Sequence, residues 1–363
     1  MKIKFDAAPG GEGLFCKTPS GGKSVALEQI VRHSRYGASP PAVIFPALPS
    51  VLECAAVTKI VFMGTPAFAV PTLQALAARY PVGGVVTQPA RPAGRGQRLA
   101  ESPIRQLARQ IGLPVIQPAR LREPEALAQL AAWAPDLIVV AAFGQILKPA
   151  VLDLPVHGCV NVHASLLPRH RGAAPIPATL LAGDAETGVT IMRMDVGLDT
   201  GPMLARRAEP IRPDDTAQTL AERLAQLGAE LLIETLPDYL AGRLTPQPQD
   251  DSRATYAPQL KKEDGHLDFT RPAAELERRV RAFTPWPGAF ALWQNQPLKI
   301  MRAAVVDTAS SQPGQVMSGE QGPVVVCGSG GLTLLEVHPP GKRPMPAADF
   351  ARGARQFIGA TLT

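Results

Sequence analysis

The sequence has few cysteines and no long apolar segment. Its four cysteines among 363 residues are scattered without a Cys-x-x-Cys pair, which argues against a disulfide framework and against a zinc ribbon. The longest uninterrupted apolar run, residues 137–143, is far shorter than the ~18–20 residues that a membrane span needs. The N-terminus also lacks the charged start, apolar stretch and cleavage site of a secretory signal. We therefore expect a cytoplasmic protein with no membrane partner.

Acidic residues are nearly absent from one stretch of the chain. The whole chain carries 37 basic and 31 acidic residues, a formal net charge of +6. Between residues 79 and 122, however, eight arginines occur with a single acid, Glu101. Arginine clusters suit phosphate groups because the planar guanidinium donates hydrogen bonds in pairs. The cluster therefore indicates an anionic partner, while a solvated basic surface remains the other interpretation.

Composition and periodicity divide the chain into four segments. Residues 1–57 contain Gly-rich and Pro-rich pieces that break any periodicity, so we expect a disordered or artefactual extension. In residues 58–242, short apolar runs alternate with helical stretches, which predicts βαβ units in a Rossmann-like, doubly wound, mostly parallel sheet. Residues 243–260 are polar and proline-containing, as expected of a linker. Residues 261–363 contain short strand-like runs, which predict a smaller OB-like β-barrel domain in this α/β protein.

The expected elements follow from this pattern. In the first domain we expect strands at residues 59–63, 82–88, 114–117, 136–142, 159–163 and 190–194, and helices ending at residue 79 and spanning 103–111, 123–133 and 216–240. Ser102 before Pro103 is a typical helix start. In the second domain we expect strands at 267–269, 289–293, 298–306, 324–327 and 332–337, and a helix at 273–282.

Polar side chains stand at the end of one of these apolar strands. Asn161 and His163 are two residues apart on strand 159–163, so they project from the same face at its carboxyl end. In open α/β sheets that edge is where ligands bind. The Asn161 amide can donate to an oxygen that gains negative charge, and the His163 imidazole can move a proton near neutral pH. A carboxylate such as Asp199 beside the imidazole would fix its tautomer and favour its charged form. Such a set suits acyl transfer onto an amine.

Each part of this constellation also has a plainer explanation. Asn161 and His163 can cap a strand end, and Asp199 can be a turn residue beside glycine. Residues 157–163 contain His-x-Cys-x3-His, but no fourth metal ligand follows at a usual spacing. Residues 64–66 follow the first strand but are not Gly-x-Gly-x-x-Gly, which disfavours a nicotinamide oxidoreductase.

Taken together, several longer motifs resemble those of the methionyl-tRNA formyltransferases, the tRNA-directed branch of the folate-dependent formyltransferase family. The motifs are KIVFMGTPAFAVPTLQAL (59–76), TQPARPAGRGQRL (87–99), NVHASLLPRHRGAAPIP (161–177), GDAETGVTIMRMDVGLDTGPML (183–204) and RAFTPWPGAF (281–290). The resemblance extends from residue 59 to about residue 360. Residues 1–57 have no counterpart in that family, so we expect the working chain to start near Val57.

The resemblance implies a reaction and its residues. It implies that Asn161, His163 and Asp199 catalyse transfer of a formyl group from 10-formyltetrahydrofolate to the α-amino group of initiator methionyl-tRNA, with no metal. It implies that the folate pocket is lined by Ser165, Leu166, Leu167 and Pro168. It also implies that a flexible loop, residues 89–99, reaches the acceptor end of the tRNA through Arg91, Arg95 and Arg98. We expect the protein to be a monomer.

Two other functions share part of these signals. A formyltransferase for a small amine, such as glycinamide ribonucleotide or an amino sugar nucleotide, would share the catalytic residues but would need neither the Arg-rich loop nor an added barrel. A non-catalytic nucleic-acid-binding protein would not need Asn161, His163 and Asp199 together.

Overall fold

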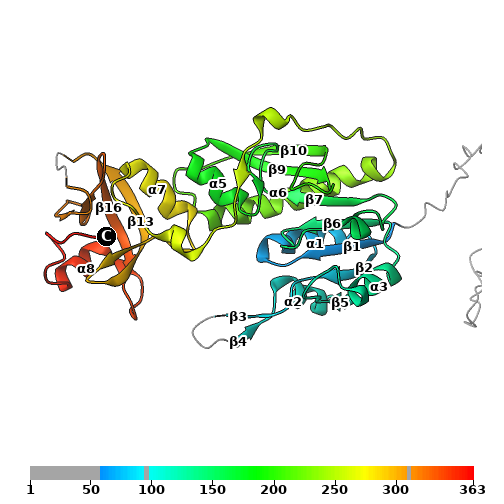
Figure 1. Ribbon diagram of the computed structural model, residues 1–363, viewed down its shortest axis with the longest axis horizontal. Coiled ribbons are helices and arrows are strands. Elements are labelled where there is room, and N and C mark those ends of the chain that lie inside the picture. The colour runs from blue at the N-terminus through cyan, green and yellow to red at the C-terminus, as the bar shows by residue number, and fades with distance from the viewer. Residues whose placement is uncertain (1–57, 94–97, 309–311) are drawn as a thin grey trace, which may run out of the picture. The chain divides into compact units, whose positions relative to one another are not determined.

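A seven-stranded sheet forms the centre of the first domain (Figure 1). The computed structural model describes residues 58–93, 98–308 and 312–363, so the expected extension lies outside the described residues. The five parallel strands are β7 (Cys159–His163), β6 (Leu137–Ala141), β1 (Ile60–Gly64), β2 (Val82–Val86) and β5 (Val115–Ile116), in this spatial order. Beyond β7, β9 (Glu186–Arg193) pairs antiparallel to β7, and β10 (Met203–Pro210) pairs antiparallel to β9.

Helices cover both faces of this sheet, as a doubly wound fold requires. One face packs against α1 (Val70–Ala77), α2 (Pro103–Gln110), α5 (Pro175–Ala182) and α6 (Ala217–Leu240). The other face packs against α3 (Pro124–Ala132) and α4 (Pro149–Leu152). The predicted mostly parallel α/β sheet is confirmed. The predicted helix start is confirmed too, because the Ser102 hydroxyl accepts a hydrogen bond from Arg105 N at 3.1 Å.

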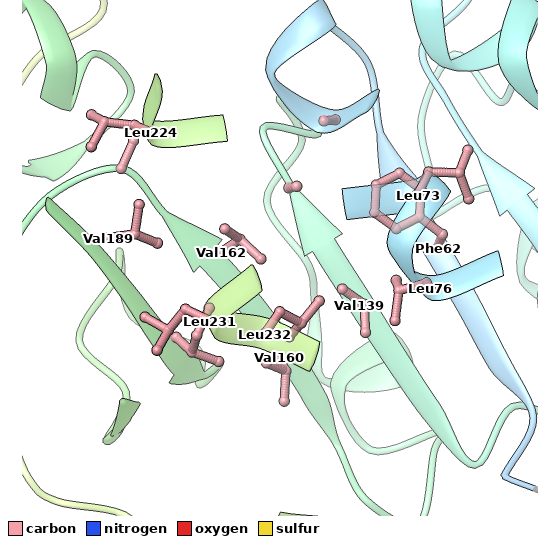
Figure 2. Packing of buried hydrophobic residues seen from close by; sticks show 14 of the residues in the cluster. Phe62, Leu73, Leu76, Val139, Val160, Val162, Val189, Leu224, Leu231 and Leu232 are labelled. Carbon is pink, nitrogen blue, oxygen red and sulfur yellow. The ribbon is translucent and has the colours of Figure 1, made fainter. Parts of the chain in front are cut away.

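The core between α6 and the sheet decides which way the side chains of β7 point. Figure 2 shows Leu231 and Leu232 of α6 against the face that carries Val160 and Val162. Burying each such aliphatic side chain contributes roughly 1.5–3 kcal/mol. Because successive side chains of a strand alternate between faces, Cys159 and the other odd-numbered residues of β7 must point to the opposite face. Cys159 indeed belongs to the core on the α3 side.

The carboxyl edge of the parallel strands contains a topological switch point. The chain builds β1, β2 and β5 outward in one direction and then returns to add β6 and β7 on the other side of β1. The segments after β1 and β6 meet there, and the Thr65 hydroxyl donates to Phe143 O at 3.1 Å. The Gln88 side chain, after β2, donates to Phe143 O and Gly144 O. Open α/β sheets bind ligands at this position.

The Arg-rich segment after β2 contains a hairpin. Strands β3 (Arg91–Ala93) and β4 (Arg98–Ala100) pair in antiparallel register, where the sequence analysis predicts a flexible loop. Figure 1 shows these two strands side by side, beyond the edge of the main sheet. Residues 94–97, including Arg95, lie outside the described residues.

The second domain contains an antiparallel sheet built from short strands, which agrees with the predicted β-rich domain. Its order is β12 (Phe290–Trp293), β13 (Gln296–Val306), β16 (Gly331–His338), β15 (Val324–Val326) and β14 (Val316–Met317), with β17 (Met345–Pro346) beside β16. Two helices, α7 (Ala273–Ala282) and α8 (Ala347–Gly353), pack against it. The last residues of the chain hydrogen-bond to both edges: Thr363 pairs with Leu292, and Leu362 N donates to Gly314 O. The OB-like topology stays a prediction.

Several strand assignments differ from expectation, among them those at residues 267–269 and at β10. Residues 267–269 form no strand but follow a 3-10 helix (Lys262–Gly265) and enter a turn. Their alternating pattern arises because Leu267 and Phe269 are both buried in the core of the second domain. The sequence analysis did not predict β10, whose outer half carries alternating exposed and half-buried residues at the edge of the sheet.

None of the helices in the described part of the chain combines the length and the apolar character needed to cross a membrane.

A buried carboxylate holds the start of α6. Asp215 accepts two hydrogen bonds from the Arg223 guanidinium, at 2.6 and 2.8 Å, and one from Arg212 N at 2.8 Å. Burial by itself would raise the pKa of Asp215, but these hydrogen bonds outweigh burial and lower its pKa to about 2. The pKa of the folded protein thus lies below the unfolded value. The resulting stability is complete well above pH 4 and is lost as the pH falls toward 2.

We therefore expect Asp215→Asn to lower the free energy of unfolding by about 2–3 kcal/mol at pH 7. The difference from the unaltered protein should shrink by about 1 kcal/mol at pH 3, where the stabilising charge is being lost. Urea unfolding at the two pH values measures both quantities. Asp238→Asn is the matched control, because Asp238 pairs with Arg243 on the surface and such pairs contribute about 1 kcal/mol or less. Equal losses in both variants would contradict the prediction.

Candidate active site

Three polar side chains converge beside the carboxyl end of β7. Asn161 and His163 lie on the same face of this strand and are buried, with 8% and 5% of their surface exposed. The third residue, Asp199, comes from the loop between β9 and β10. Its Oδ1 accepts a hydrogen bond from Asn161 Nδ2 at 3.4 Å, and its Oδ2 lies 3.6 Å from His163 Nδ1. The structure thus brings together the three residues that the sequence analysis selects.

The loop that carries Asp199 is folded by its own hydrogen bonds. Asp195 Oδ1 accepts from Gly197 N at 3.0 Å and from the Thr200 hydroxyl at 2.7 Å, which makes Asp195 the turn residue of this loop. Asp199 has a different environment. It has a positive φ of 54°, and its Oδ2 accepts from Gly172 N at 2.9 Å. Its carboxylate is therefore directed toward β7 and away from the turn.

The tautomer of His163 is set by a main-chain carbonyl. Its Nε2 lies 3.0 Å from His170 O, and because a carbonyl oxygen can only accept, Nε2 must carry a hydrogen. Nδ1 is then the ring atom that faces Asp199 and can gain or lose a proton. This differs from the expectation that Asp199 would fix the tautomer.

The carbonyl that binds His163 is itself held in place. His170 has a positive φ of 59°, and its Nε2 lies 2.8 Å from Asp184 Oδ2. Arg169 donates to both oxygens of Asp184, at 2.6 and 2.8 Å. Burial by itself would raise the pKa of Asp184, but the hydrogen bonds from Arg169 and His170 outweigh burial and lower its pKa. A charged carboxylate therefore anchors His170 at neutral pH.

The segment predicted to be a linker takes part in this site. Strand β11 (Tyr256–Ala257) pairs with β8 (Arg171–Gly172), directly after His170. The Thr255 hydroxyl accepts from His170 N at 2.8 Å, and Gln249 donates to Asp199 O at 2.8 Å. The sequence analysis missed these residues. Their polar, proline-containing surroundings have no periodicity that would have indicated a buried contact.

Comparisons with known proteins identify the family of this chain. The formyl transferase family model matches residues 58–236, and the model of the formyl transferase C-terminal domain matches residues 259–355. A methionyl-tRNA formyltransferase from Geobacter sulfurreducens is 51% identical over 306 residues, which cover 84% of this chain and 96% of that protein. One from Methylococcus capsulatus is 54% identical over 294 residues, 80% of this chain and 96% of that protein. This chain belongs to the methionyl-tRNA formyltransferase family.

A solved structure supports the fold of this formyltransferase. The N-formyltransferase from Helicobacter canadensis, in complex with folinic acid and dTDP-3-aminofucose, superposes with a TM-score of 0.56. The match covers 76% of this chain and 97% of that one, at 17% sequence identity. At this identity the likeness concerns the fold alone.

The four residues expected at the folate site lie directly after β7 of the formyltransferase. Ser165, Leu167 and Pro168 are buried and Leu166 is half-buried. Leu167 N donates to the Thr190 hydroxyl at 3.1 Å, and that hydroxyl donates to Ser165 O at 2.7 Å. Most of these side chains therefore face the interior, and main-chain atoms of the segment bind Thr190 of β9. Their contact with folate stays a prediction.

Less of the expected tRNA-binding arginines than of the folate segment lies among the described residues. The structure describes the backbone of Arg91 on β3 and of Arg98 on β4, and Arg95 lies outside the described residues. Their role in this formyltransferase stays a prediction.

The structure separates the residues of the alternative metal pattern. Cys159 and His163 are four positions apart on one strand, which at a rise of about 3.3 Å per residue places them about 13 Å apart. The Cys159 thiol donates to Val151 O, and burial raises its pKa to about 12. No cluster of three His, Cys, Asp or Glu side chains within the described ranges could hold a metal ion.

The position of Gly172 permits a test of how Asp199 is held. Gly172 has φ of 121°, and a Cβ atom there would lie 2.5 Å from Ala257 O. We expect Gly172→Ala to displace the strand and withdraw its N–H from Asp199, lowering the rate of formyl transfer by about 10–10²-fold. Steady-state kinetics of the purified variant measures this rate.

Gly112→Ala is the matched control. Gly112 also has a positive φ, of 74°, but an added Cβ atom there would meet no heavy atom within 4 Å. This variant should lose about 1 kcal/mol of stability and keep its activity. An unaltered rate for Gly172→Ala would show that its N–H is not needed to hold Asp199.

Proposed function

We propose that this formyltransferase moves the formyl group of 10-formyltetrahydrofolate to the α-amino group of initiator methionyl-tRNA. One observation carries the proposal: Asn161, His163 and Asp199 converge at one strand end in a chain about half identical to enzymes named methionyl-tRNA formyltransferase. The reaction forms a bond between the amine nitrogen and the formyl carbon. It breaks the bond from that carbon to the folate nitrogen, which receives a proton.

The amine needs little activation by the protein in order to react. An α-amino group has a pKa near 7.7–8.0 in reference peptides, so a useful fraction is already nucleophilic at neutral pH. When bound, the formyl-folate supplies the electrophilic carbon. What the protein must manage is the negative charge on the formyl oxygen and the proton that the amine loses.

Asn161 is suited to stabilise the negative charge that forms on the formyl oxygen. Its Nδ2 carries two hydrogens, and only one points toward Asp199, at the long distance of 3.4 Å. The second hydrogen has no hydrogen-bond partner within the described part of the chain and can bind an oxygen as it becomes negative. Loss of one such donor costs about 10²–10³ in rate in other enzymes.

His163 is suited to transfer the proton that the amine loses. Because Nε2 is bound to His170 O, Nδ1 is the atom that takes the proton from the amine and returns it to the leaving nitrogen. The 3.6 Å separation between His163 Nδ1 and Asp199 Oδ2 exceeds a normal hydrogen bond. A proton on Nδ1 is therefore not held by the carboxylate and can pass to the leaving nitrogen. The negative charge of Asp199 stabilises the imidazolium when it forms.

Two exposed apolar side chains, one after β6 and one beside Asp199, are suited to a folate ring. Ile146, on the segment after β6, is 70% exposed, and Leu198, next to Asp199, is 46% exposed. A flat heterocycle needs apolar walls and a few backbone groups for orientation. We propose that these two segments hold the folate together with Ser165, Leu166, Leu167 and Pro168.

The tRNA would bind outside this site. We propose that the hairpin of β3 and β4 contacts the acceptor end through Arg91, Arg95 and Arg98, because arginines bind phosphates along a strand. In this proposal residues 58–242 form the catalytic domain, 243–260 connect the domains, and 261–363 add phosphate contacts through an OB-like fold. The enzyme would act as a cytoplasmic monomer.

A small-amine formyltransferase is the alternative that shares the catalytic residues. It is not favoured, because the relatives that are about 50% identical carry names that refer to methionyl-tRNA. Formyl incorporation into methionyl-tRNA and into glycinamide ribonucleotide, measured with the same folate donor, distinguishes the two. Transfer to the small amine alone would overturn the proposal.

The catalytic roles predict that Asn161→Ala and His163→Ala each lower kcat by at least about 10²-fold. Affinity for the tRNA should stay within about twofold, since neither side chain is assigned to bind it. Single-turnover formylation and filter binding measure the two quantities. His157→Ala, just before the opposite end of β7, is the matched control and should retain activity. Near-normal turnover of either active-site variant would refute its role.

The tRNA role predicts a different pattern for Arg95→Ala. We expect the KM for methionyl-tRNA to rise about tenfold while the KM for the folate changes little, because a phosphate contact acts on one substrate only. Arg79→Ala is the matched control, since Arg79 is an exposed arginine before β2, at the opposite edge of the sheet. Equal changes for both substrates would reject the hairpin as a tRNA contact.

A further inference from the structure

The amide of Gln249 makes four hydrogen bonds with three residues. Its Nε2 donates to the main-chain oxygens of Asp199 and Gly201, both at 2.8 Å. Its Oε1 accepts from Arg171 Nε at 3.0 Å and from a terminal nitrogen of Arg171 at 2.8 Å. Carbonyl oxygens only accept and a guanidinium only donates, so these partners fix which end of the amide is which.

These contacts join the two segments that hold the Asp199 carboxylate. On one side, Gln249 binds the backbone of Asp199 itself. On the other side it binds Arg171, the neighbour of Gly172, whose N–H donates to Asp199 Oδ2 at 2.9 Å. Asp199 has φ of 54°, a conformation that an aspartate keeps only when its surroundings impose it. Gln249 supplies two of the bonds that do so.

The Arg171 end of this bridge is itself firmly held. The Arg171 side chain is only 11% exposed and also donates to Asp251 Oδ1 at 2.6 Å. Its main chain pairs with Tyr256 in the ladder between β8 and β11. A movement of Gln249 would therefore be transmitted to Asp199, because Arg171 has little freedom to follow.

We propose that Gln249 is a positioning residue that keeps the Asp199 carboxylate directed toward Asn161 and His163. The activity that it serves is the formyl transfer proposed above, on which this inference rests. Gln249 touches neither reacting group, so its effect on the reaction passes through Asp199.

The sharpest variant is Gln249→Glu. It keeps the shape of the side chain and its contacts with Arg171, but it places an oxygen against the carbonyl oxygens of Asp199 and Gly201, where the amide donated. We expect kcat to fall about 10–10²-fold, while the KM values for tRNA and folate stay within about twofold. Gln247→Glu is the matched control: this glutamine is exposed, and it meets Met203 through its main chain. It should keep normal kinetics.

A double-mutant cycle separates positioning from a general structural role. If Gln249 acts through Asp199, adding Gln249→Glu to Asp199→Ala should lower the residual kcat by no more than about twofold. Losses that multiply in full would overturn the inference. Thermal unfolding of Gln249→Glu, with Gln247→Glu beside it, should show that the folded state is retained.

Crystal structures of the variant and the unaltered protein test the inference without any assay. We expect the Asp199 carboxylate of the Gln249→Glu protein to be displaced from Asn161 and His163. A carboxylate in its original position would overturn the inference, whatever the activity. If the unaltered protein fails to formylate methionyl-tRNA, the proposed function fails, and the crystal structures still decide whether Gln249 positions Asp199.

Discussion

A single carboxylate joins the parts of the site. Asp199 accepts hydrogen bonds from Asn161 on β7 and from Gly172 on β8, and it faces Nδ1 of His163. Its side chain is only 12% exposed, and a charge so far from water is tolerated only when hydrogen bonds replace the lost solvation. Strand β7, the loop before β10 and the ladder of β8 with β11 must therefore all be in place before the carboxylate can occupy this position.

The part of the site on β7 was predictable because it is a local property of one strand. Val160 and Val162 face α6 in the core, and the period of two then directs Asn161 and His163 to the opposite face. The same local patterns predicted the apolar parallel strands and the amphipathic helix α6. Such patterns failed at residues 267–269, where two core side chains with strand-like spacing lie in a turn.

The remaining contacts could not be predicted, because they join polar segments that are distant in the sequence. Gln249 and Asp199 are 50 positions apart, and Thr255 and His170 are 85 apart. None of these four residues stands in a periodic segment, and hydrogen bonds between such segments leave no pattern in a single sequence. The tautomer of His163 was missed for the same reason, because it depends on the carbonyl of His170, a residue that hydrogen bonds with Asp184 and Thr255 hold in place.

The sequence composition predicts a linker between the domains at residues 243–260, but residues of this segment make hydrogen bonds to the first domain. Residues 243–260 look like a linker in sequence, yet Thr255 and Gln249 complete the surroundings of His170 and Asp199. Past this segment, Phe283 at the end of α7 is buried in the core of the first domain. A chain that ended after α6 would keep Asn161, His163 and Asp199 but lose the groups that orient them. The packed unit around His170 and Asp199 therefore extends beyond residue 242, and the second domain is attached through the segment that contacts these two residues.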